Sequence, residues 1–350
     1  MKRPLGRRRL SFGLALAMLL TACTPGPSAT PAASVADSGP PATGPAPTSS
    51  AGAGPSPEGS AAARSGRIVF TQFEVSTGQF AVFTIKADGS DLQPVLVGGQ
   101  PLLARGSLRS AAVSRWSPDG KWIAVTTSTP NGAFEVIVQA DGTNERELIR
   151  PDPTLQLRCL AWSRDGSHLV CQGSDSTKAG RIGLYTVRSS DGGGLQRLTS
   201  FSGGAAETPG DYSPDGSQIA FVRQTYAPSS LGQLWACNAD GSNVHKLTDT
   251  LTGYDVSWSP DGQAIAGDAN GKLLIFDLRN PGVGPTAITI PSGSATQPRW
   301  SPDGTRLVFQ FVANGATSPD IYTVKADGTD PRRLTSNPSS DVSPDWGTAP

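Results

Sequence analysis

Trp116-Ser-Pro-Asp-Gly120 is the first of six related phrases that recur along the chain and decide its fold. The others are Trp162–Gly166, Tyr212–Gly216, Trp258–Gly262, Trp300–Gly304 and Val342–Trp346. Their serines are separated by 46, 50, 46, 42 and 42 residues. A repeat of this length is typical of a propeller blade with four strands, so we expect a repeat protein.

Each phrase predicts a tight turn between two strands. Proline presets φ at the second turn position, aspartate bonds back to the backbone, and glycine accepts a positive φ at the end. An alternating apolar run follows, as in Ile219–Val222, and a second turn of the Asp-Gly type comes later, as at Asp88-Gly89. Asp-Gly between apolar runs is a strong hairpin signal. The predicted turn residues are Asp119, Gly120, Asp165, Gly166, Asp215, Gly216, Asp261, Gly262, Asp303 and Gly304.

The two ends of the repeat region are predicted to build one blade together. The last phrase, starting at Asp341, supplies one strand, and Gly66–Phe70 looks like the strand that normally follows the turn. Pairing these segments closes a ring and removes free sheet edges. The expected fold is therefore all-β: a six-bladed β-propeller over residues 66–350, with four-stranded antiparallel blades and the last blade closed by the N-terminal strand.

The first 22 residues predict a lipoprotein signal peptide. A basic start precedes the apolar run Leu10–Ala22, which is shorter than the roughly 20 residues that a membrane-spanning helix needs. The run leads into Leu20–Cys23, which matches the lipobox of bacterial lipoproteins. On this interpretation Cys23 is lipidated and anchors an exported protein to the membrane; the alternative is an ordinary secretory signal with an incidental cysteine. Residues 23–65, rich in Pro, Ala, Ser and Gly, predict a disordered tether.

The full repeat pattern, Trp-Ser-Pro-Asp-Gly, then Ile-Ala-Phe, Ile-Tyr, Ala-Asp-Gly and Leu-Thr, resembles the repeats of TolB propellers. The resemblance covers about 285 residues, effectively the whole predicted folded domain. Several positions depart from it: Arg164 replaces proline, Tyr212 and Val342 replace tryptophan, and Arg279–Gly282 replaces Ala-Asp-Gly. TolB also carries an N-terminal α/β domain, whose place is taken here by the predicted tether. The resemblance therefore implies the propeller fold and leaves TolB's own role in an envelope complex aside.

Composition and motifs disfavour several kinds of chemistry. Lys plus Arg and Asp plus Glu both total 29, so no net positive charge favours nucleic acid. His168 and His245 are far apart in sequence and predict no zinc site, and no Gly-x-Ser-x-Gly motif occurs. The tryptophans of the phrases are interpreted as packing between blades rather than as a sugar platform. We expect no metal, no cofactor and no catalytic residues.

Three cysteines lie in the predicted domain. Cys159 and Cys171 are symmetric about the turn at Asp165-Gly166, which would place them opposite each other in a hairpin. A disulfide and a pair of buried thiols are both consistent with this spacing. Cys237 completes an odd count, which leaves at least one free thiol.

Antiparallel alternation places both kinds of turn on one side of the propeller and the longer, more varied loops on the other. We call the latter the loop-rich face, and function in repeat scaffolds concentrates in such loops. Residues predicted to ring the channel mouth there are Arg109, Arg158, Glu207, Asp211, Tyr254, Asp255, Arg299 and Asp341. The alternative is that these are ordinary solvated loop residues.

These features favour a monomeric, non-enzymatic binding scaffold that engages a protein or another envelope component through the loop-rich face. Two other functions stay open. One is a polysaccharide lyase or glycosidase that uses the carboxylates of Glu207, Asp211, Asp255 and Asp341 as acid and base. The other is a lipoprotein that senses a solute or signal.

Overall fold

The structure is a computed structural model of the chain. It describes residues 66–74, 78–104, 113–129, 132–150, 152, 154–175, 178–201, 206–224 and 231–348. The predicted signal peptide, the lipidation site Cys23, the tether and the candidate residue Arg109 lie outside the described residues. Within them, no helix is long and apolar enough to cross a membrane.

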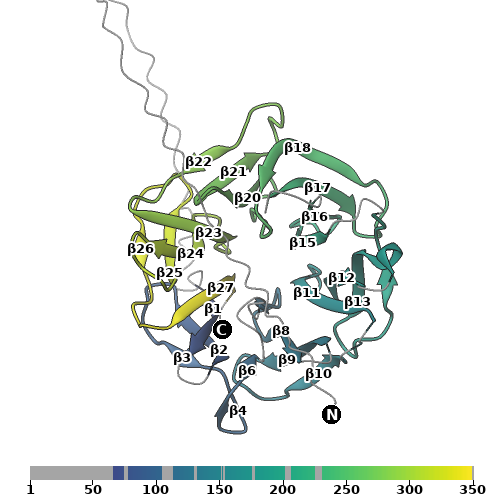
Figure 1. Cartoon of the computed structure of the whole chain (residues 1–350), viewed down its shortest axis with the longest axis horizontal. Coiled ribbons are helices and arrows are strands. Elements are labelled where there is room, and N and C mark those ends of the chain that lie inside the picture. Colours follow the sequence, from purple (N-terminus) through teal and green to yellow (C-terminus); the bar gives the residue numbers. More distant parts are fainter. Residues whose placement is uncertain are drawn as a thin grey trace, which may run out of the picture. The chain divides into compact units, whose positions relative to one another are not determined.

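Six antiparallel sheets surround a common centre (Figure 1), and we number them as blades 1 to 6. From the innermost strand outward, blade 1 contains β27 (Ser340–Gly347), β1 (Arg67–Glu74), β2 (Gln79–Lys86) and β3 (Gln93–Pro94), and β6 (Leu103–Ala104) also pairs with β2. The short strands β4 (Leu96–Val97) and β5 (Gln100–Pro101) form a separate hairpin.

The other blades follow in chain order, each again from the innermost strand outward. Blade 2 contains β7 (Val113–Trp116), β8 (Trp122–Thr129), β9 (Gly132–Gln139) and β10 (Arg146–Ile149); blade 3 contains β11 (Gln156–Trp162), β12 (His168–Ser174), β13 (Gly183–Arg188) and β14 (Gln196–Arg197), with the 3-10 helix η2 (Ala179–Arg181) before β13. Blade 4 contains β15 (Glu207–Tyr212), β16 (Gln218–Arg223), β17 (Gly232–Asn238) and β18 (His245–Thr252). Blade 5 contains β19 (Ser257–Trp258), β20 (Ala264–Ala269), β21 (Lys272–Asp277) and β22 (Thr286–Ile288); blade 6 contains β23 (Gly293–Trp300), β24 (Arg306–Ala313), β25 (Asp320–Lys325) and β26 (Arg332–Arg333). The predicted six-bladed, all-β propeller is confirmed.

Blade 1 is closed by strands from opposite ends of the domain. β27 pairs with β1 in an antiparallel register that sets Gly347 opposite Arg67 and Trp346 opposite Ile68. The chain then continues to Thr348, whose hydroxyl donates to the carbonyl of Pro118 in blade 2 at 3.0 Å. The C-terminal segment therefore completes one blade and also contacts the first turn of the next, as the closure prediction requires.

Five of the six phrases form the same hydrogen-bonded turn. In blade 2 the Ser117 hydroxyl donates to Asp119 Oδ1 at 2.6 Å and accepts the backbone N–H of Trp122 at 2.9 Å. The same two bonds recur after Ser163, Ser213, Ser259 and Ser301. The final glycine of each turn has a φ of 69° to 74°, which only glycine adopts readily.

The sixth phrase has no turn and runs within β27. Ser343 takes a φ of 55° there, and Asp345 Oδ2 accepts the backbone N–H of Trp116 at 2.8 Å. The aspartate that closes a turn in the other phrases therefore ties the C-terminal strand to blade 2.

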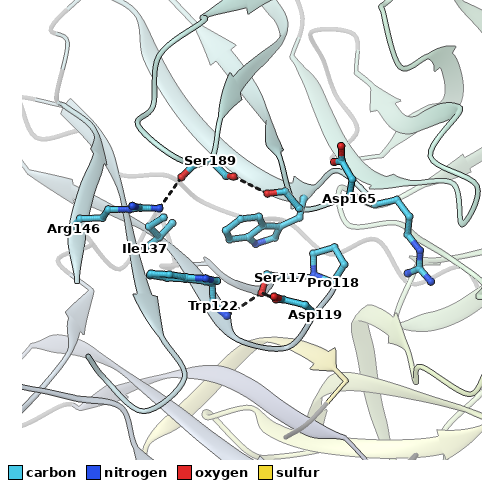
Figure 2. A pocket seen from close by; sticks show the side chains of 11 residues that line it. Ser117, Pro118, Asp119, Trp122, Ile137, Arg146, Asp165 and Ser189 are labelled. Atoms are coloured by element: carbon cyan, nitrogen blue, oxygen red, sulfur yellow. Dashed lines mark hydrogen bonds between the residues drawn. The ribbon is translucent and has the colours of Figure 1, made fainter. Parts of the chain in front are cut away.

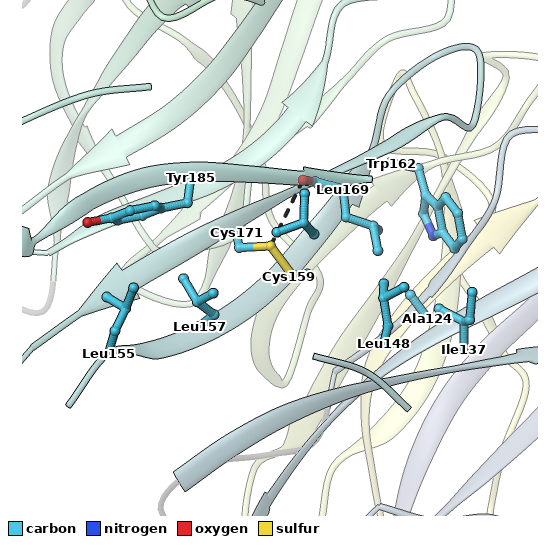
Figure 3. Close-up of a cluster of buried hydrophobic side chains, with 11 residues drawn as sticks. Ala124, Ile137, Leu148, Leu155, Leu157, Cys159, Trp162, Leu169, Cys171 and Tyr185 are labelled. Carbon is cyan, nitrogen blue, oxygen red and sulfur yellow. Dashed lines mark hydrogen bonds between the residues drawn. A yellow bond between two sulfur atoms is a disulfide. The ribbon is translucent and has the colours of Figure 1, made fainter. Parts of the chain in front are cut away.

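Apolar clusters fill the spaces between adjacent blades. Figure 3 shows the one between blades 2 and 3, where Ile137 and Leu148 of blade 2 meet Leu157 and Trp162 of blade 3. The phrase tryptophans in the described residues are all buried. Their place in these clusters matches the predicted packing role, and burial of such large side chains stabilises the contact between blades.

A disulfide joins the two innermost strands of blade 3. Cys159 lies directly opposite Cys171 in the β11–β12 register, with Cα atoms 3.8 Å apart, and their sulfur atoms are bonded (Figure 3). Cys237 in β17 is a buried free thiol.

Gly120→Ala is expected to destabilise the protein more than Gly166→Ala. Both glycines end equivalent turns with almost equal φ, so each substitution should cost about 1–2 kcal/mol for a left-handed residue. Only at Gly120 would the new Cβ lie 1.7 Å from the Thr348 carbonyl oxygen, whereas Gly166 has no atom closer than 4.0 Å. Relief of that overlap should cost about a further 1–3 kcal/mol. Urea unfolding of the two variants measures the difference, and equal losses would contradict this account of closure.

Candidate binding site at the central channel

One repeat position lines the centre of the ring. The residue before the aromatic at the end of each innermost strand contributes to a single cavity of about 200 Å³ that opens on the side carrying the Ser-Pro-Asp-Gly turns. In blade 1 that aromatic is Trp346, which faces Ile68 as Trp116 faces Ile123. Four of these six residues are charged and alternate in sign around the ring with two small residues between them; in blade order they are Asp345, Arg115, Ala161, Asp211, Ser257 and Arg299.

Asp255 is the centre of an ion-pair network beneath this cavity. Its Oδ1 accepts hydrogen bonds from Arg115 Nη2 at 2.9 Å and from Arg299 Nη2 at 3.1 Å. Its Oδ2 accepts the side-chain amide of Gln297 at 3.0 Å. The two arginine side chains are 5% and 4% exposed, so these ion pairs are almost fully removed from water.

The two arginines also bond to backbone carbonyls of other blades. Arg115 donates to the Leu160 carbonyl of blade 3 at 3.1 Å. Arg299 donates to the Gly210 carbonyl of blade 4 at 3.2 Å. Together with Asp255 in the segment that enters blade 5, the network links blades 2 to 6 across the centre. Removing one partner of such a buried pair typically costs about 3–5 kcal/mol, so the network constrains the ring.

Burial and neighbouring charges set the ionisation of the network. Burial favours the neutral form of Asp255, but the positive charges of Arg115 and then Arg299 hold its pKa below the ordinary value. Burial, followed by repulsion from Arg299, lowers the pKa of Arg115 to about 10, so it stays charged at neutral pH. The centre therefore holds a carboxylate between two guanidinium groups.

Three other carboxyl groups near the centre have raised pKa values, in each case mainly because of burial. The pKa of Asp211 is raised to about 6, with Asp345 adding repulsion. The pKa of Asp268, which accepts the backbone N–H of Gln297, is raised to about 7. The pKa of Glu135 is raised to about 8, against the opposing hydrogen bond from Thr126.

The residues singled out in the sequence take different places. Asp211, Asp255 and Arg299 meet at the centre, and Arg158 lies close enough to be attracted by Asp255 and Glu135. Tyr254, in the link between β18 and β19, is 44% exposed. Two buried carboxylates connect a blade to the segment before it: Glu207 accepts hydrogen bonds from Arg223 of blade 4 and from Thr199 after β14, and Asp341 accepts them from Gln72 of blade 1 and from Asn337 after β26.

Sequence reasoning did not single out Arg115, Gln297, Asp268, Asp345 or Glu135. A signal for two of them was present, since Arg115 and Asp345 each precede a tryptophan, as Arg299 precedes Trp300. In the part of the chain that the structure describes, no group of three or more His, Cys, Asp or Glu side chains is placed to hold a metal ion. The ion pairs of Asp255 with Arg115 and Arg299 thus form a polar network at the centre that is suited to holding the ring rigid.

Comparison with known proteins places this architecture among its relatives. The family model described as TolB beta propeller domain matches residues 58–280. "Protein TolB homolog" of Chlorobium chlorochromatii (strain CaD3) is 33% identical over 147 residues, covering 41% of this chain and 32% of the relative. "Tol-Pal system protein TolB" of Anaeromyxobacter dehalogenans (strain 2CP-C) is 35% identical over 120 residues, covering 33% and 24%. The matched part of the chain thus spans about a third or less of the length of these curated relatives.

Solved structures resemble the chain in fold. TolB from Acinetobacter baumannii has a TM-score of 0.62 at 21% identity, covering 81% of this chain and 66% of that chain. Kuenenia stuttgartiensis hydrazine synthase has a TM-score of 0.59 at 14% identity, covering 80% and 46%. At these identities the likeness concerns the propeller architecture alone.

Glu135→Gln is expected to weaken the pH dependence of stability. Because the pKa of Glu135 is raised from 4.5 to about 8, the folded protein keeps a proton that the unfolded chain has released. The free energy of unfolding should therefore fall as pH rises between these two values. Glutamine has no such proton and retains an acceptor for Thr126, so urea unfolding across this range should show a smaller fall. The exposed Glu147→Gln is the control, and an identical response of the two variants would refute the prediction.

Proposed function

This chain belongs to the TolB beta propeller domain family, and from that premise we propose that it is a membrane-anchored, non-catalytic binding scaffold outside the cytoplasm. It engages a protein or another component of the cell envelope through its loop-rich face. Family membership supports the scaffold, and a relative named as a Tol-Pal system protein supports participation in a larger assembly. The lipobox at Leu20–Cys23 supports export and anchoring.

The observation that carries the proposal is the engagement of three of the four carboxylates considered as acid and base. Asp255 accepts hydrogen bonds from three side chains, and Glu207 and Asp341 each accept them from two. A general acid or base must be free to exchange a proton with a substrate. Because these groups are held by their own neighbours, the residues do not favour a lyase or glycosidase at the channel.

The loop-rich face offers a surface for a partner on this rigid support. Described connections there include η2 before β13, the β24–β25 connection and the link that carries Tyr254. An exposed tyrosine on a fixed backbone is a typical anchor at protein interfaces, because it buries a large area with little loss of side-chain freedom. Tyr254 is therefore the residue that we expect a partner to cover.

Cys23→Ser is expected to move the protein from the membrane fraction to the soluble fraction. The substitution removes the sulfur atom that would carry the lipid, and with it the main contribution to membrane affinity. Ultracentrifugation of lysed cells and mass spectrometry of the N-terminal peptide measure the change. Ser28→Ala in the predicted tether is the control, and persistent membrane association of an unlipidated Cys23→Ser protein would argue against the anchor.

Tyr254→Ala is expected to reduce capture of the envelope partner. Full-length protein would be cross-linked in intact envelopes and purified, and the cross-linked partner measured by quantitative mass spectrometry. Truncation of a central aromatic anchor should lower capture about tenfold or more. Val283→Ala is the matched control. Val283 is 72% exposed, but it lies in the β21–β22 connection of blade 5, on the side opposite the loop-rich face. Absence of any captured partner, or equal loss in both variants, would overturn the proposal.

A further inference from the structure

A second cavity lies between blades 2 and 3, on the side of the Ser-Pro-Asp-Gly turns. Its volume is about 400 Å³, and we call it the Trp122 pocket after the indole in its wall. Figure 2 shows Ile137 and Arg146 beside the Trp122 ring and Ser189 across the cavity. The walls come from both blades; they are Ser117, Pro118, Asp119, Trp122, Ile137, Arg146, Trp162, Arg164, Asp165, Gly166 and Ser189. The pocket lies away from the loop-rich face, so the inference goes beyond the function proposed above.

The position of Trp122 varies along the repeat: blades 1, 3, 4, 5 and 6 have Arg67, His168, Gln218, Ala264 and Arg306 there. In blade 6 the equivalent residue is Arg306, which donates to Thr323 Oγ1 at 3.1 Å and pairs with Asp330 at 2.9 Å. Blade 1 makes the same contacts with Arg67, Thr84 and Asp91, at 3.1 Å and 2.7 Å. Two blades thus fill this position with an arginine held across the outer strands.

Blade 2 replaces that arrangement with Trp122, Ile137 and Asn144. The register is the same, because Trp122 pairs with Gln139 as Arg306 pairs with Lys325. The indole is only half-buried, and the Arg146 guanidinium lies 5.1 Å from its ring centroid. Arg146 is held in place by a hydrogen bond to the Ser189 carbonyl at 3.1 Å. The indole packs partly against the apolar cluster between blades 2 and 3 and leaves the rest of its surface uncovered beside Arg146.

A second departure from the repeat lines the same pocket. Arg164 stands where the other four turns have proline, whose ring contacts the glycine of the next blade's turn, as Pro118 does at Gly166. Arg164 is exposed and makes no hydrogen bond or ion pair with any described residue. Two positions that depart from the repeat pattern thus meet at one cavity: Arg164 makes no ion pair there, and Trp122 keeps part of its ring uncovered by the blade packing.

We propose that the Trp122 pocket binds one pyranose unit of a neutral oligosaccharide. A pyranose ring has an apolar C–H face, which the indole of Trp122 can cover, and a rim of hydroxyl groups that donate and accept hydrogen bonds. The pocket matches that rim with the guanidinium groups of Arg146 and Arg164 and the carboxylates of Asp119 and Asp165. A flat apolar surface bordered by a few polar groups is the usual composition of a small-molecule site, and the volume lies in the usual range.

The charges of the pocket residues favour a neutral ligand over an anionic one. The two arginines and two aspartates that line the pocket cancel, so the lining itself does not select for phosphate or another anion, and Lys121 outside the lining pairs with Asp119 at 3.5 Å. Hydrogen bonds, first from Ser163, lower the pKa of Asp165 to about 2, so its carboxylate remains negative and repels anions at neutral pH. A neutral ligand with many hydroxyl groups satisfies both kinds of charged group at once.

The test uses the full-length chain with chitotriose, cellotriose and maltotriose as probes. Saturation-transfer NMR and calorimetry should detect binding of at least one of them. A triple variant, Trp122→Arg with Ile137→Thr and Asn144→Asp, installs the residues that blades 1 and 6 use. It should keep the β-rich circular dichroism spectrum of the unmodified chain, with a lower unfolding midpoint because Ile137 leaves the apolar cluster, and bind the sugar about tenfold more weakly or worse. Gln218→Ala, at the equivalent position of blade 4, should leave binding unchanged.

A second variant tests the pocket without changing Trp122. Arg164→Pro restores the proline found in the other turns and should also weaken sugar binding while the protein stays folded. The proposal is overturned if none of the three sugars binds, or if the triple variant and Arg164→Pro both bind as the unmodified chain does. It is equally overturned if inorganic phosphate or a proline-rich peptide binds the pocket in place of the sugars.

Discussion

Closure of the ring between the two ends of the domain is the constraint on which the rest of the structure depends. Five blades are continuous segments, but blade 1 exists only when β27 pairs with β1. An open ring would expose two blade faces and an unpaired strand edge, both of which favour association with other chains. The close approach of Thr348 to Gly120 and the bond from Asp345 to the Trp116 backbone show how tightly the junction is built.

Once the ring is closed, its centre becomes a place where charges from distant parts of the sequence must be accommodated. Asp255 meets arginines that lie 140 and 44 residues away along the chain. Buried ion pairs contribute little net stability compared with apolar packing, but they penalise any arrangement that separates the partners. The channel network is therefore better understood as fixing the relative positions of the blades than as a reactive centre. The raised pKa values of Asp211, Asp268 and Glu135 follow from the same burial.

Repetition makes it possible to separate structural from functional residues within one chain. Each blade position occurs six times, so the residues that the fold requires recur, whereas a residue required by a ligand need occur once. The serines and aspartates of the turns recur because their hydrogen bonds close each hairpin. Trp122 is the only indole at a position that holds arginine, histidine, glutamine or alanine in the other blades, Arg164 replaces a proline, and both line one cavity. That contrast is the basis for assigning a ligand to the Trp122 pocket.

Local order was determined by the sequence: the turn phrase, its spacing and the alternating runs predicted strands, turns, six blades and closure at residue 66. These features depend on hydrogen bonds and backbone angles within a few residues, which short motifs encode. The contacts of the charged residues were harder to predict from the sequence. Asp255 and Arg299 were singled out and lie at the centre, but Glu207 and Asp341 bond to their own blades and to the link from the preceding blade, and Arg115 and Gln297 were passed over. Only the tertiary structure decided which charges meet. Whether a side chain points into the channel or toward its own blade depends on strand bulges and ring closure, and short sequence motifs do not encode these long-range features.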